Sequence, residues 1–291
     1  MPSAPGILLK LFILPIILSI LVFPFQSNVH ILFPRESKPP RFLLLTAHPD
    51  DECMFFAPTL LGLLAVHSDP EVYSLCLSVG NADGLGAIRR NELQRSLDIL
   101  GVPGGRRWAL DRPDLQDNIS IQWDYGALAQ AILPYILEHN ITTILTFDYH
   151  GVSSHPNHIS LPYGATQLIT SLYSSPDTYG GAPRLFSLVT TSLFNKYTGP
   201  LAPTLVRLRI LSALVLDHLV PDNGLGTYGN SSVFISGISG YKAALHAMMQ
   251  HRSQLVWFRW LYVAFSRYMW TNEWIEITPC CVEPVPAAGD K

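Results

Sequence analysis

The stretch RFLLLTAHPDDE, residues 41–52, indicates both a fold class and the position of a site. Its first half is a short, largely apolar run ending at Ala47, which is typical of a strand buried on both faces of a parallel sheet. Four polar side chains follow directly: His48, Asp50, Asp51 and Glu52. In open parallel sheets, ligands bind beyond the carboxyl ends of the strands, so these four side chains are candidates for chemistry.

Apolar strand-like runs and helical patterns alternate along the rest of the chain. Besides 41–47, we predict strands at 72–79, 107–110, 141–147, 184–194 and 233–236. Helical spacing occurs at 87–100, 125–139, 159–173 and 240–252. Such alternation is typical of βαβ units. We therefore expect one α/β domain over residues 41–270, with a Rossmann-like, mostly parallel sheet flanked by helices.

A second polar cluster, His155-Pro156-Asn157-His158, follows the predicted strand 141–147. An Asp-Asp pair alone is usually a helix cap, and His-x-x-His alone is common on helices and loops. Together, at the ends of two parallel strands, the clusters favour a metal site. Zinc with three protein ligands and an open position activates water and polarises a carbonyl, and the spare acidic and basic groups can move protons. This inventory is suited to hydrolysis of an amide.

The composition points to a membrane and away from nucleic acid. Apolar residues make up 48% of the 291 residues and charged residues only 14%, below the roughly 25% usual in soluble domains. A net charge of −3 and the absence of basic runs argue against nucleic-acid binding. The four cysteines show no metal-ligand spacing and no disulfide framework, which fits a reducing compartment.

Residues 6–25 form an apolar stretch interrupted only by Lys10, and it is long enough for one transmembrane helix. A cleaved signal peptide is the alternative, but the bulky residues 22–25 do not resemble a cleavage site. Arg35, Lys38 and Arg41 follow the stretch, so the positive-inside rule places the globular domain in the cytosol. We expect a linker at 26–40 and a C-terminal tail at 271–291.

Residues 255–270 are aromatic throughout and carry Arg259 and Arg267. This stretch is either a core helix or an interfacial helix with its rings at the acyl boundary. Apolar residues fall on nearly every side, which favours membrane contact. Residues 201–220 are a further apolar stretch, in which Arg207 and Arg209 argue against a second span.

The AHPDDE segment and the later His-x-x-His resemble the PIG-L/LmbE-like deacetylase family. Further segments are similar to its eukaryotic branch, and the resemblance covers roughly residues 41–269. They are SVGNADGLG at 78–86, Arg89-x-x-Glu92-Leu93, GVSSHPNHIS at 151–160, HRSQ at 251–254 and WFRWLYVAFSRYM at 257–269.

The resemblance implies roles for individual residues. The ligands of Zn²⁺, or of another divalent metal in the same site, would be His48, Asp51 and His158. Asp50 would be the general base, and a protonated His155 would stabilise the oxyanion or assist departure of the amine. Arg89 and His251 would lie near the substrate, with Glu52 in support. Asn157 stands where many bacterial members have aspartate, so whether Asn157 or Asp148 supports His155 stays open.

The eukaryotic branch also implies a reaction: de-N-acetylation of N-acetylglucosaminyl-phosphatidylinositol to glucosaminyl-phosphatidylinositol and acetate, the second step of glycosylphosphatidylinositol anchor biosynthesis. We then expect a glycolipid substrate and a single-pass location in the endoplasmic reticulum membrane. Two alternatives stay open. One is a deacetylase of a soluble N-acetylglucosamine conjugate, and the other is a non-catalytic membrane scaffold of the same fold.

Overall fold

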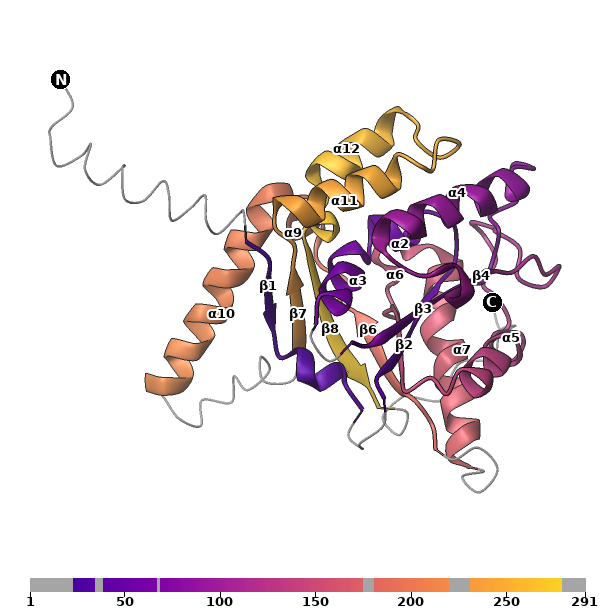
Figure 1. Cartoon of the computed structure of the whole chain (residues 1–291), viewed down its shortest axis with the longest axis horizontal. Coiled ribbons are helices and arrows are strands. Elements are labelled where there is room, and N and C mark those ends of the chain that lie inside the picture. The colour runs from indigo at the N-terminus through magenta and orange to yellow at the C-terminus, as the bar shows by residue number, and fades with distance from the viewer. Residues whose placement is uncertain (1–22, 35–38, 67–68, 175–180, 220–230, 279–291) are drawn as a thin grey trace, which may run out of the picture.

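The computed structural model describes residues 23–34, 39–66, 69–174, 181–219 and 231–278. Its centre is an eight-stranded sheet with the order β1-β7-β8-β6-β5-β2-β3-β4, and helices cover both faces (Figure 1). Most of the predicted transmembrane stretch, residues 6–22, lies outside the described residues. Its last residue, Phe25, begins strand β1.

Five strands form the parallel part of the sheet: β2 (Arg41–Thr46), β3 (Glu71–Cys76), β4 (Arg107–Ala109), β5 (Thr143–Phe147) and β6 (Arg184–Leu188). The predicted strands at 41–47, 72–79, 107–110 and 141–147 are therefore confirmed in position. The strand predicted at 184–194 ends at Leu188, and a helical turn follows, α9 (Leu193–Lys196). Strands β2 and β5 are neighbours, so the two polar clusters lie at the same edge of the sheet.

The remaining three strands are antiparallel: β1 (Phe25–Ser27), β7 (Ser231–Ile235) and β8 (Thr271–Ile277). The sheet is thus mixed: four of the pairings between described strands are parallel, as expected for most of the sheet, and three are antiparallel. Strand β8 lies between β6 and β7, whereas we predict a C-terminal tail from residue 271. The sequence of β8, TNEWIEI, is more polar than is usual for a central strand. The central position is possible because Glu273 and Glu276 pair with arginines, while Trp274 is fully buried.

The expected linker at 26–40 is partly folded onto the domain. It contains most of β1 and the short helix η1 (Val29–Leu32), in which Leu32 is fully buried. The backbone carbonyl of Leu32 accepts a hydrogen bond from the Thr143 hydroxyl at 2.9 Å.

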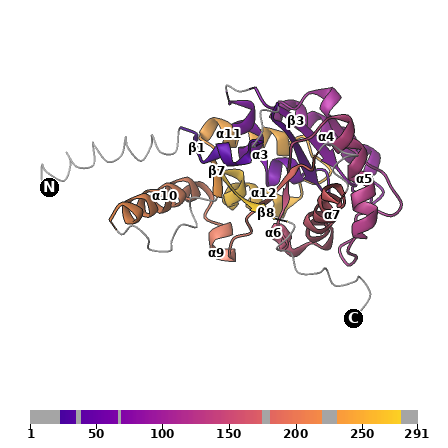
Figure 2. The same cartoon turned by 90° about the horizontal axis from the view of Figure 1, so that it is seen from below.

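Two helical layers enclose the sheet (Figures 1 and 2). One contains α3 (Ala57–Leu64), α4 (Gly86–Leu100) and α11 (Ile238–Met248), which contact one another. The other contains α5 (Tyr125–Glu138) and α7 (Pro156–Tyr173), and α7 packs on β2, β5 and β6. The short helix α2 (Asp51–Met54) carries Asp51 and Glu52 of the first polar cluster, whereas α6 (Gly151–Ser154) ends just before the second cluster, in which His155 caps α7. The short helix η2 (Gly104–Arg106) precedes β4.

Three further helical segments extend beyond these layers: η3 (Gly199–Leu201), α10 (Ala202–Leu219) and α12 (Trp257–Phe265), with η5 (Arg267–Met269) after α12. In the described part of the chain, one helical stretch, Gly199–Leu216, is long and apolar enough to cross a membrane, and only 22% of it is buried. This stretch is internal and is distinct from the predicted N-terminal anchor.

Candidate active site

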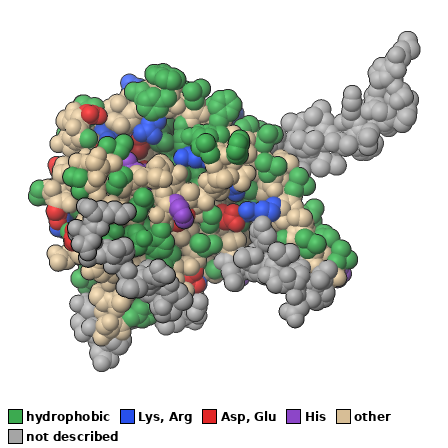
Figure 3. Space-filling model, turned by 180° about the vertical axis from the view of Figure 1, so that it is seen from behind, with side chains coloured by type: hydrophobic (Ala, Val, Ile, Leu, Met, Phe, Trp, Pro, Cys, Tyr) green, Lys and Arg blue, Asp and Glu red, His purple; other side chains and the backbone are tan. Residues whose placement is uncertain are grey.

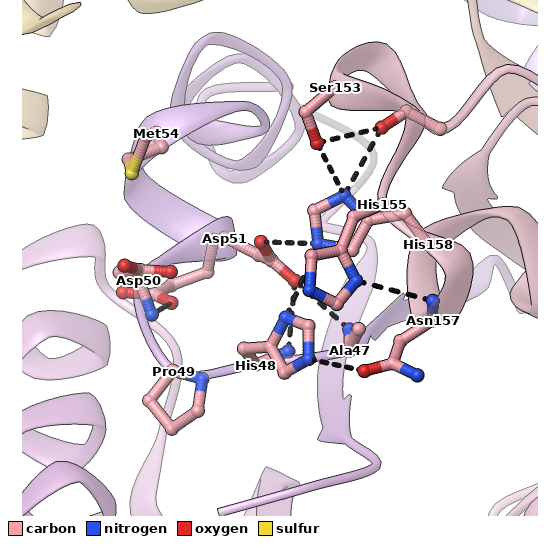
Figure 4. A network of polar contacts seen from close by, with 12 residues as sticks. Ala47, His48, Pro49, Asp50, Asp51, Met54, Ser153, His155, Asn157 and His158 are labelled. Carbon is pink, nitrogen blue, oxygen red and sulfur yellow. Dashed lines mark hydrogen bonds and ion pairs between the residues drawn. The ribbon is translucent and has the colours of Figure 1, made fainter. Parts of the chain in front are cut away.

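The turn after β2 holds the first polar cluster in a strained conformation. Asp50 has a φ of 115°, in a region that non-glycine residues rarely adopt. Oδ2 of Asp51 locks the turn, because it accepts hydrogen bonds from the backbone N–H groups of Ala47 at 3.0 Å and His48 at 2.9 Å. The two adjacent acids consequently diverge, and Figure 4 shows Asp51 pointing toward the histidines and Asp50 away from them.

Three donor atoms meet where the two clusters face each other (Figure 4). His158 Nε2 lies 3.3 Å from His48 Nδ1 and 3.2 Å from Asp51 Oδ1. All three side chains are buried. Oδ2 of Asp51 is occupied by the turn, so Oδ1 is the oxygen that faces the histidines. The three predicted ligands are therefore brought together.

The outer nitrogens of the two histidines determine their tautomers. His158 Nδ1 lies 3.1 Å from the Gly151 carbonyl, and His48 Nε2 lies 3.0 Å from Asn157 Oδ1. Both oxygens can only accept, since the Asn157 amide nitrogen donates to the Ile121 carbonyl. Each histidine thus carries its proton on the outer nitrogen and presents a lone pair to the other, beside a carboxylate. Such an arrangement fits a cation, and ligating histidines usually have outer partners of this kind.

His155 lies beside this donor set and is a further candidate ligand. Donor atoms of His48, His155 and His158 all lie within 4.8 Å of one another. His155 caps helix α7, because its Nδ1 accepts the backbone N–H of Asn157 at 3.2 Å. A neutral His155 therefore carries its proton on Nε2, which suits a hydrogen-bond donor better than a metal ligand.

The protonated state expected for His155 is not favoured by its surroundings. Burial, followed by the neighbouring His48 and His158, lowers the pKa of His155 to about 4, although Asp117 and Asp51 oppose this. Neutral His155 still presents Nε2–H.

Asp50 stands apart from the three donors and lines the adjacent cavity. Burial is the main cause that raises the pKa of its carboxyl. Its Oδ2 forms an ion pair at 3.2 Å with Nη2 of Arg259, without hydrogen-bond geometry. Arg259 comes from α12, so the aromatic segment reaches directly to the predicted base.

Arg89 also lines the cavity, and its role near the substrate stays a prediction. Its guanidinium is largely engaged by the protein, because it donates to the carbonyls of Gly80 and Pro49, each at 2.9 Å. Gly80 has a φ of +68°, and a Cβ there would collide with the Arg89 side chain. Arg89 therefore also braces the turn that carries Asp50.

Asp117 belongs to the site and was not identified from the sequence. Its Oδ1 lies 3.2 Å from His48 Nε2 and 3.9 Å from His155 Nε2, and its Oδ2 lies 3.2 Å from Arg89 Nη1. Burial would lower the pKa of His48, but Asp117 and then Asp51 raise it. No local motif marks Asp117, which lies in a polar loop between β4 and α5.

The open question of what supports His155 is answered by this geometry. The Asn157 side chain supports His48, and only the Asn157 backbone contacts His155. Asp148 accepts hydrogen bonds from the backbone of His150, Gly151 and Thr190, so it orders the loop before α6. Among the described carboxylates, Asp117 is the nearest ion-pair partner of His155.

His251 does not face the cavity, contrary to the prediction that it contacts substrate. It is fully buried, and its Nε2 lies 2.7 Å from Glu52 Oε1, which also accepts a hydrogen bond from Ser96. The other oxygen of Glu52 accepts the backbone N–H of Asp50 at 3.0 Å. His251 thus acts through Glu52, on the turn that carries the two acids.

The buried Glu52–His251 pair predicts a pH-dependent stability. Burial would lower the pKa of His251, but Glu52 raises it above its ordinary 6.5. Burial would raise the pKa of Glu52, but His251 and Ser96 lower it below 4.5. The contribution of the pair is therefore fully present between these two values, and it is lost as the pH rises through the raised pKa of His251. We expect Glu52→Gln to lower the free energy of unfolding by about 3–5 kcal/mol at pH 6 and by less at pH 9.

Urea unfolding of the detergent-solubilised full chain at both pH values measures this difference. Glu71→Gln, a partly exposed ion-pair variant, serves as the control. An equal deficit for Glu52→Gln at pH 6 and pH 9 would contradict the ionised pair.

The cavity beside the donors has a volume of about 930 Å³. Its floor is lined by the three predicted ligands and by five further polar residues: Asp50, Asp83, Arg89, Asp117 and His155. Of these, Asp83 comes from the glycine-rich loop. Its outer wall is formed by α12 and the segment around α9, through Phe258, Leu261, Phe265, Lys196 and Tyr197. A polar, catalytic floor thus joins an apolar, aromatic wall.

A mixed sheet covered by helices, with this donor set and separate acid–base groups, is the arrangement of a hydrolytic enzyme. Comparisons with known proteins identify the family of that enzyme. The PIG-L family model, GlcNAc-PI de-N-acetylase, matches residues 43–169. The chain is 35% identical over 235 residues to N-acetylglucosaminyl-phosphatidylinositol de-N-acetylase of Bos taurus, covering 80% of this chain and 81% of the relative. It is 36% identical over 244 residues to the probable enzyme of that name from Dictyostelium discoideum, covering 81% and 93%.

The fold is similar to that of N,N'-diacetylchitobiose deacetylase from Pyrococcus horikoshii, with a TM-score of 0.56 at 14% identity, over 99% of this chain and 98% of that one. The chain belongs to the PIG-L family of de-N-acetylases. The predicted family and the predicted deacetylase class of enzyme are thereby confirmed.

Proposed function

We propose that this chain hydrolyses the acetamide of N-acetylglucosaminyl-phosphatidylinositol, releasing acetate and leaving glucosaminyl-phosphatidylinositol, as the second step of glycosylphosphatidylinositol anchor biosynthesis. The observation that carries the proposal is the convergence of His48, Asp51 and His158 in a cavity with an aromatic wall. Asp50, which is separate from these three donors, lines the same cavity. The relatives named above, whose names give this substrate, support the choice of glycolipid.

The donor set fits a divalent cation such as Zn²⁺, which His48, His158 and Asp51 would hold through Nδ1, Nε2 and Oδ1 respectively. When bound, such an ion polarises the acetyl carbonyl and makes water more acidic. The outer partners of the two histidines keep the inner nitrogens unprotonated, which is the state that ligation requires.

The protein side chains then perform the proton transfers. Asp50 removes a proton from the attacking water, whose oxygen forms a bond to the acetyl carbon. Nε2–H of His155 donates a hydrogen bond to the developing oxyanion. The carbon–nitrogen bond breaks, and the proton held by Asp50 passes to the departing amine, so acetate and a free amino sugar result.

Asp117 is proposed as the residue that positions His48 and His155 by charge. We expect Asp117→Asn to weaken metal affinity by about 10–100-fold, the usual effect of losing an outer partner. Chelator competition measures the affinity. Asp114→Asn is the matched control, because Asp114 lies in the same loop but, among the described residues, forms its ion pair with the partly exposed Arg112 and not with the site. Unchanged affinity in Asp117→Asn would remove Asp117 from the site.

Mass-spectrometric detection of acetate loss from N-acetylglucosaminyl-phosphatidylinositol tests the proposed reaction. Activity should disappear with a chelator and return with added Zn²⁺. A soluble N-acetylglucosaminyl-inositol conjugate tests the alternative substrate. If the soluble conjugate is hydrolysed and the glycolipid is not, the glycolipid assignment fails. The confirmed deacetylase class disfavours a non-catalytic scaffold.

We also propose that residues 6–25 anchor the chain in the endoplasmic reticulum membrane with the domain in the cytosol. The flanking cations Arg35, Lys38 and Arg41 support this orientation. Protease treatment of sealed microsomes should digest the domain, and protection of the domain would contradict the orientation.

A further inference from the structure

Helix α12 presents its inner side to the active site and an apolar outer side to solvent. Inside, the Tyr262 hydroxyl donates to the Met54 carbonyl of α2 at 3.1 Å, and Val263 is buried. Outside, Trp257 is 76% exposed, and Phe258 and Leu261 are each more than half exposed. A soluble surface seldom leaves so many large apolar side chains together.

The segment around α9 continues this outer side. Phe194 is 91% exposed, and Leu193 and Leu201 are also largely exposed. Gly199, with a φ of +47°, allows η3 to pack closely on α12, since a Cβ there would lie 3.1 Å from the Ala264 carbonyl oxygen. We call the six exposed residues the apolar rim: Leu193, Phe194, Leu201, Trp257, Phe258 and Leu261. Two of them also line the cavity, so the rim borders its mouth.

Helix α10 extends the apolar surface away from the cavity. Its inner side packs on β7, where Val206 and Ile210 contact Val233 and Ile235. Its outer side carries a row of exposed leucines: Leu205, Leu208, Leu211 and Leu214. Figure 1 shows α10 beside β1, at whose start the described chain begins, and the backbone carbonyl of Phe23 accepts a hydrogen bond from Arg207. Phe23, which directly follows the apolar stretch 6–22 in the sequence, therefore lies next to this surface.

The charges of the two segments favour a lipid surface as occupant. Neither 193–216 nor 256–270 contains an aspartate or glutamate, and their charged residues are Lys196, Arg207, Arg209, Arg259 and Arg267. Of these, Arg209 and Arg267 pair with Glu273, and Arg259 pairs with Asp50. Figure 3 shows hydrophobic side chains gathered across the upper part of the molecule with basic side chains near them. Tryptophan and basic residues beside an apolar surface are typical of protein at the level of lipid headgroups.

We propose that the apolar rim and the outer side of α10 dock on the bilayer and hold the cavity mouth at the headgroup level. The docking of this surface on a bilayer is inferred from its geometry alone, whereas its use in catalysis rests on the proposed function. The acyl chains of a glycolipid stay in the membrane, while its sugar enters between α9 and α12. Lys196 and Arg259, which line the cavity, then lie near the phosphodiester.

The test uses the full chain with Cys280→Ser and Cys281→Ser, because the other two cysteines are buried. A single cysteine at Phe194 or Trp257 carries an environment-sensitive fluorophore, in phosphatidylcholine vesicles containing nitroxide-labelled lipid. Tyr173→Cys is the control, since Tyr173 is 59% exposed at the end of α7. We expect quenching at 194 and 257 to exceed that at 173 by about twofold or more, as for groups 5–10 Å below the headgroups.

Equal, weak quenching at all three positions would overturn membrane docking. A blue-shifted signal that depends on protein concentration and is not quenched by lipid would overturn it in favour of a second copy of the chain. The readout requires no catalysis, so loss of the proposed function leaves it interpretable. Conversely, Phe194→Ser/Trp257→Ser should lower kcat/KM for vesicle-borne glycolipid by about tenfold while sparing a soluble conjugate.

Discussion

Asp50→Asn is expected to lower kcat by about 10²–10⁴-fold while the protein keeps its metal, because a positioned general base contributes a factor of that size. The Asp50 side chain is buried at the cavity floor, and its carboxylate forms an ion pair with Arg259 rather than with a proposed ligand. Its backbone N–H is held by Glu52, so the turn should survive the substitution. Single-turnover rates and elemental analysis measure the two quantities separately.

The matched control for this prediction is Asp83→Asn. Asp83 also lines the cavity, but it is exposed and belongs to the glycine-rich loop. We expect this control to change kcat only slightly. If Asp50→Asn lost its metal in parallel with its activity, Asp50 would be a ligand rather than the base.

The parallel part of the fold was predictable because it depends on local patterns. Residues 41–46 are apolar throughout, apart from the terminal Arg41 and Thr46, which is what a strand buried on both faces requires. The convergence of the two clusters followed from the neighbouring positions of parallel strand ends. Strand β8 could not be predicted in this way, because its glutamates are neutralised by arginines far away in the sequence, such as Arg184.

The candidate site shows the same division between local and distant information. The motifs identified His48, Asp51 and His158, which the structure brings together. Asp117 escaped notice because its partners His48 and Arg89 are reached only through the tertiary fold. For His251, the HRSQ motif at 251–254 did not reveal which way the side chain points. The intervening Glu52 decides that, and it directs His251 into the core.

The choice between Asp51 and His155 as third ligand yields the last prediction. We expect Asp51→Asn to weaken metal affinity by about 100-fold or more, because a three-ligand site rarely survives loss of one ligand. Oδ1 of Asp51 lies 3.2 Å from His158 Nε2, and an amide oxygen can still accept the backbone N–H groups that lock the turn. Activity should return in part with excess metal.

His155→Gln is the counterpart, and it should keep the metal while lowering kcat. Nδ1 of His155 is occupied by the Asn157 backbone, and Nε2 carries the proton of the neutral ring. Chelator competition and elemental analysis of both variants distinguish the two ligand sets. If His155→Gln lost its metal and Asp51→Asn retained it, the three histidines whose donor atoms lie within 4.8 Å of one another would be the ligands. Asp51 would then serve to lock the turn, and another group would have to stabilise the oxyanion.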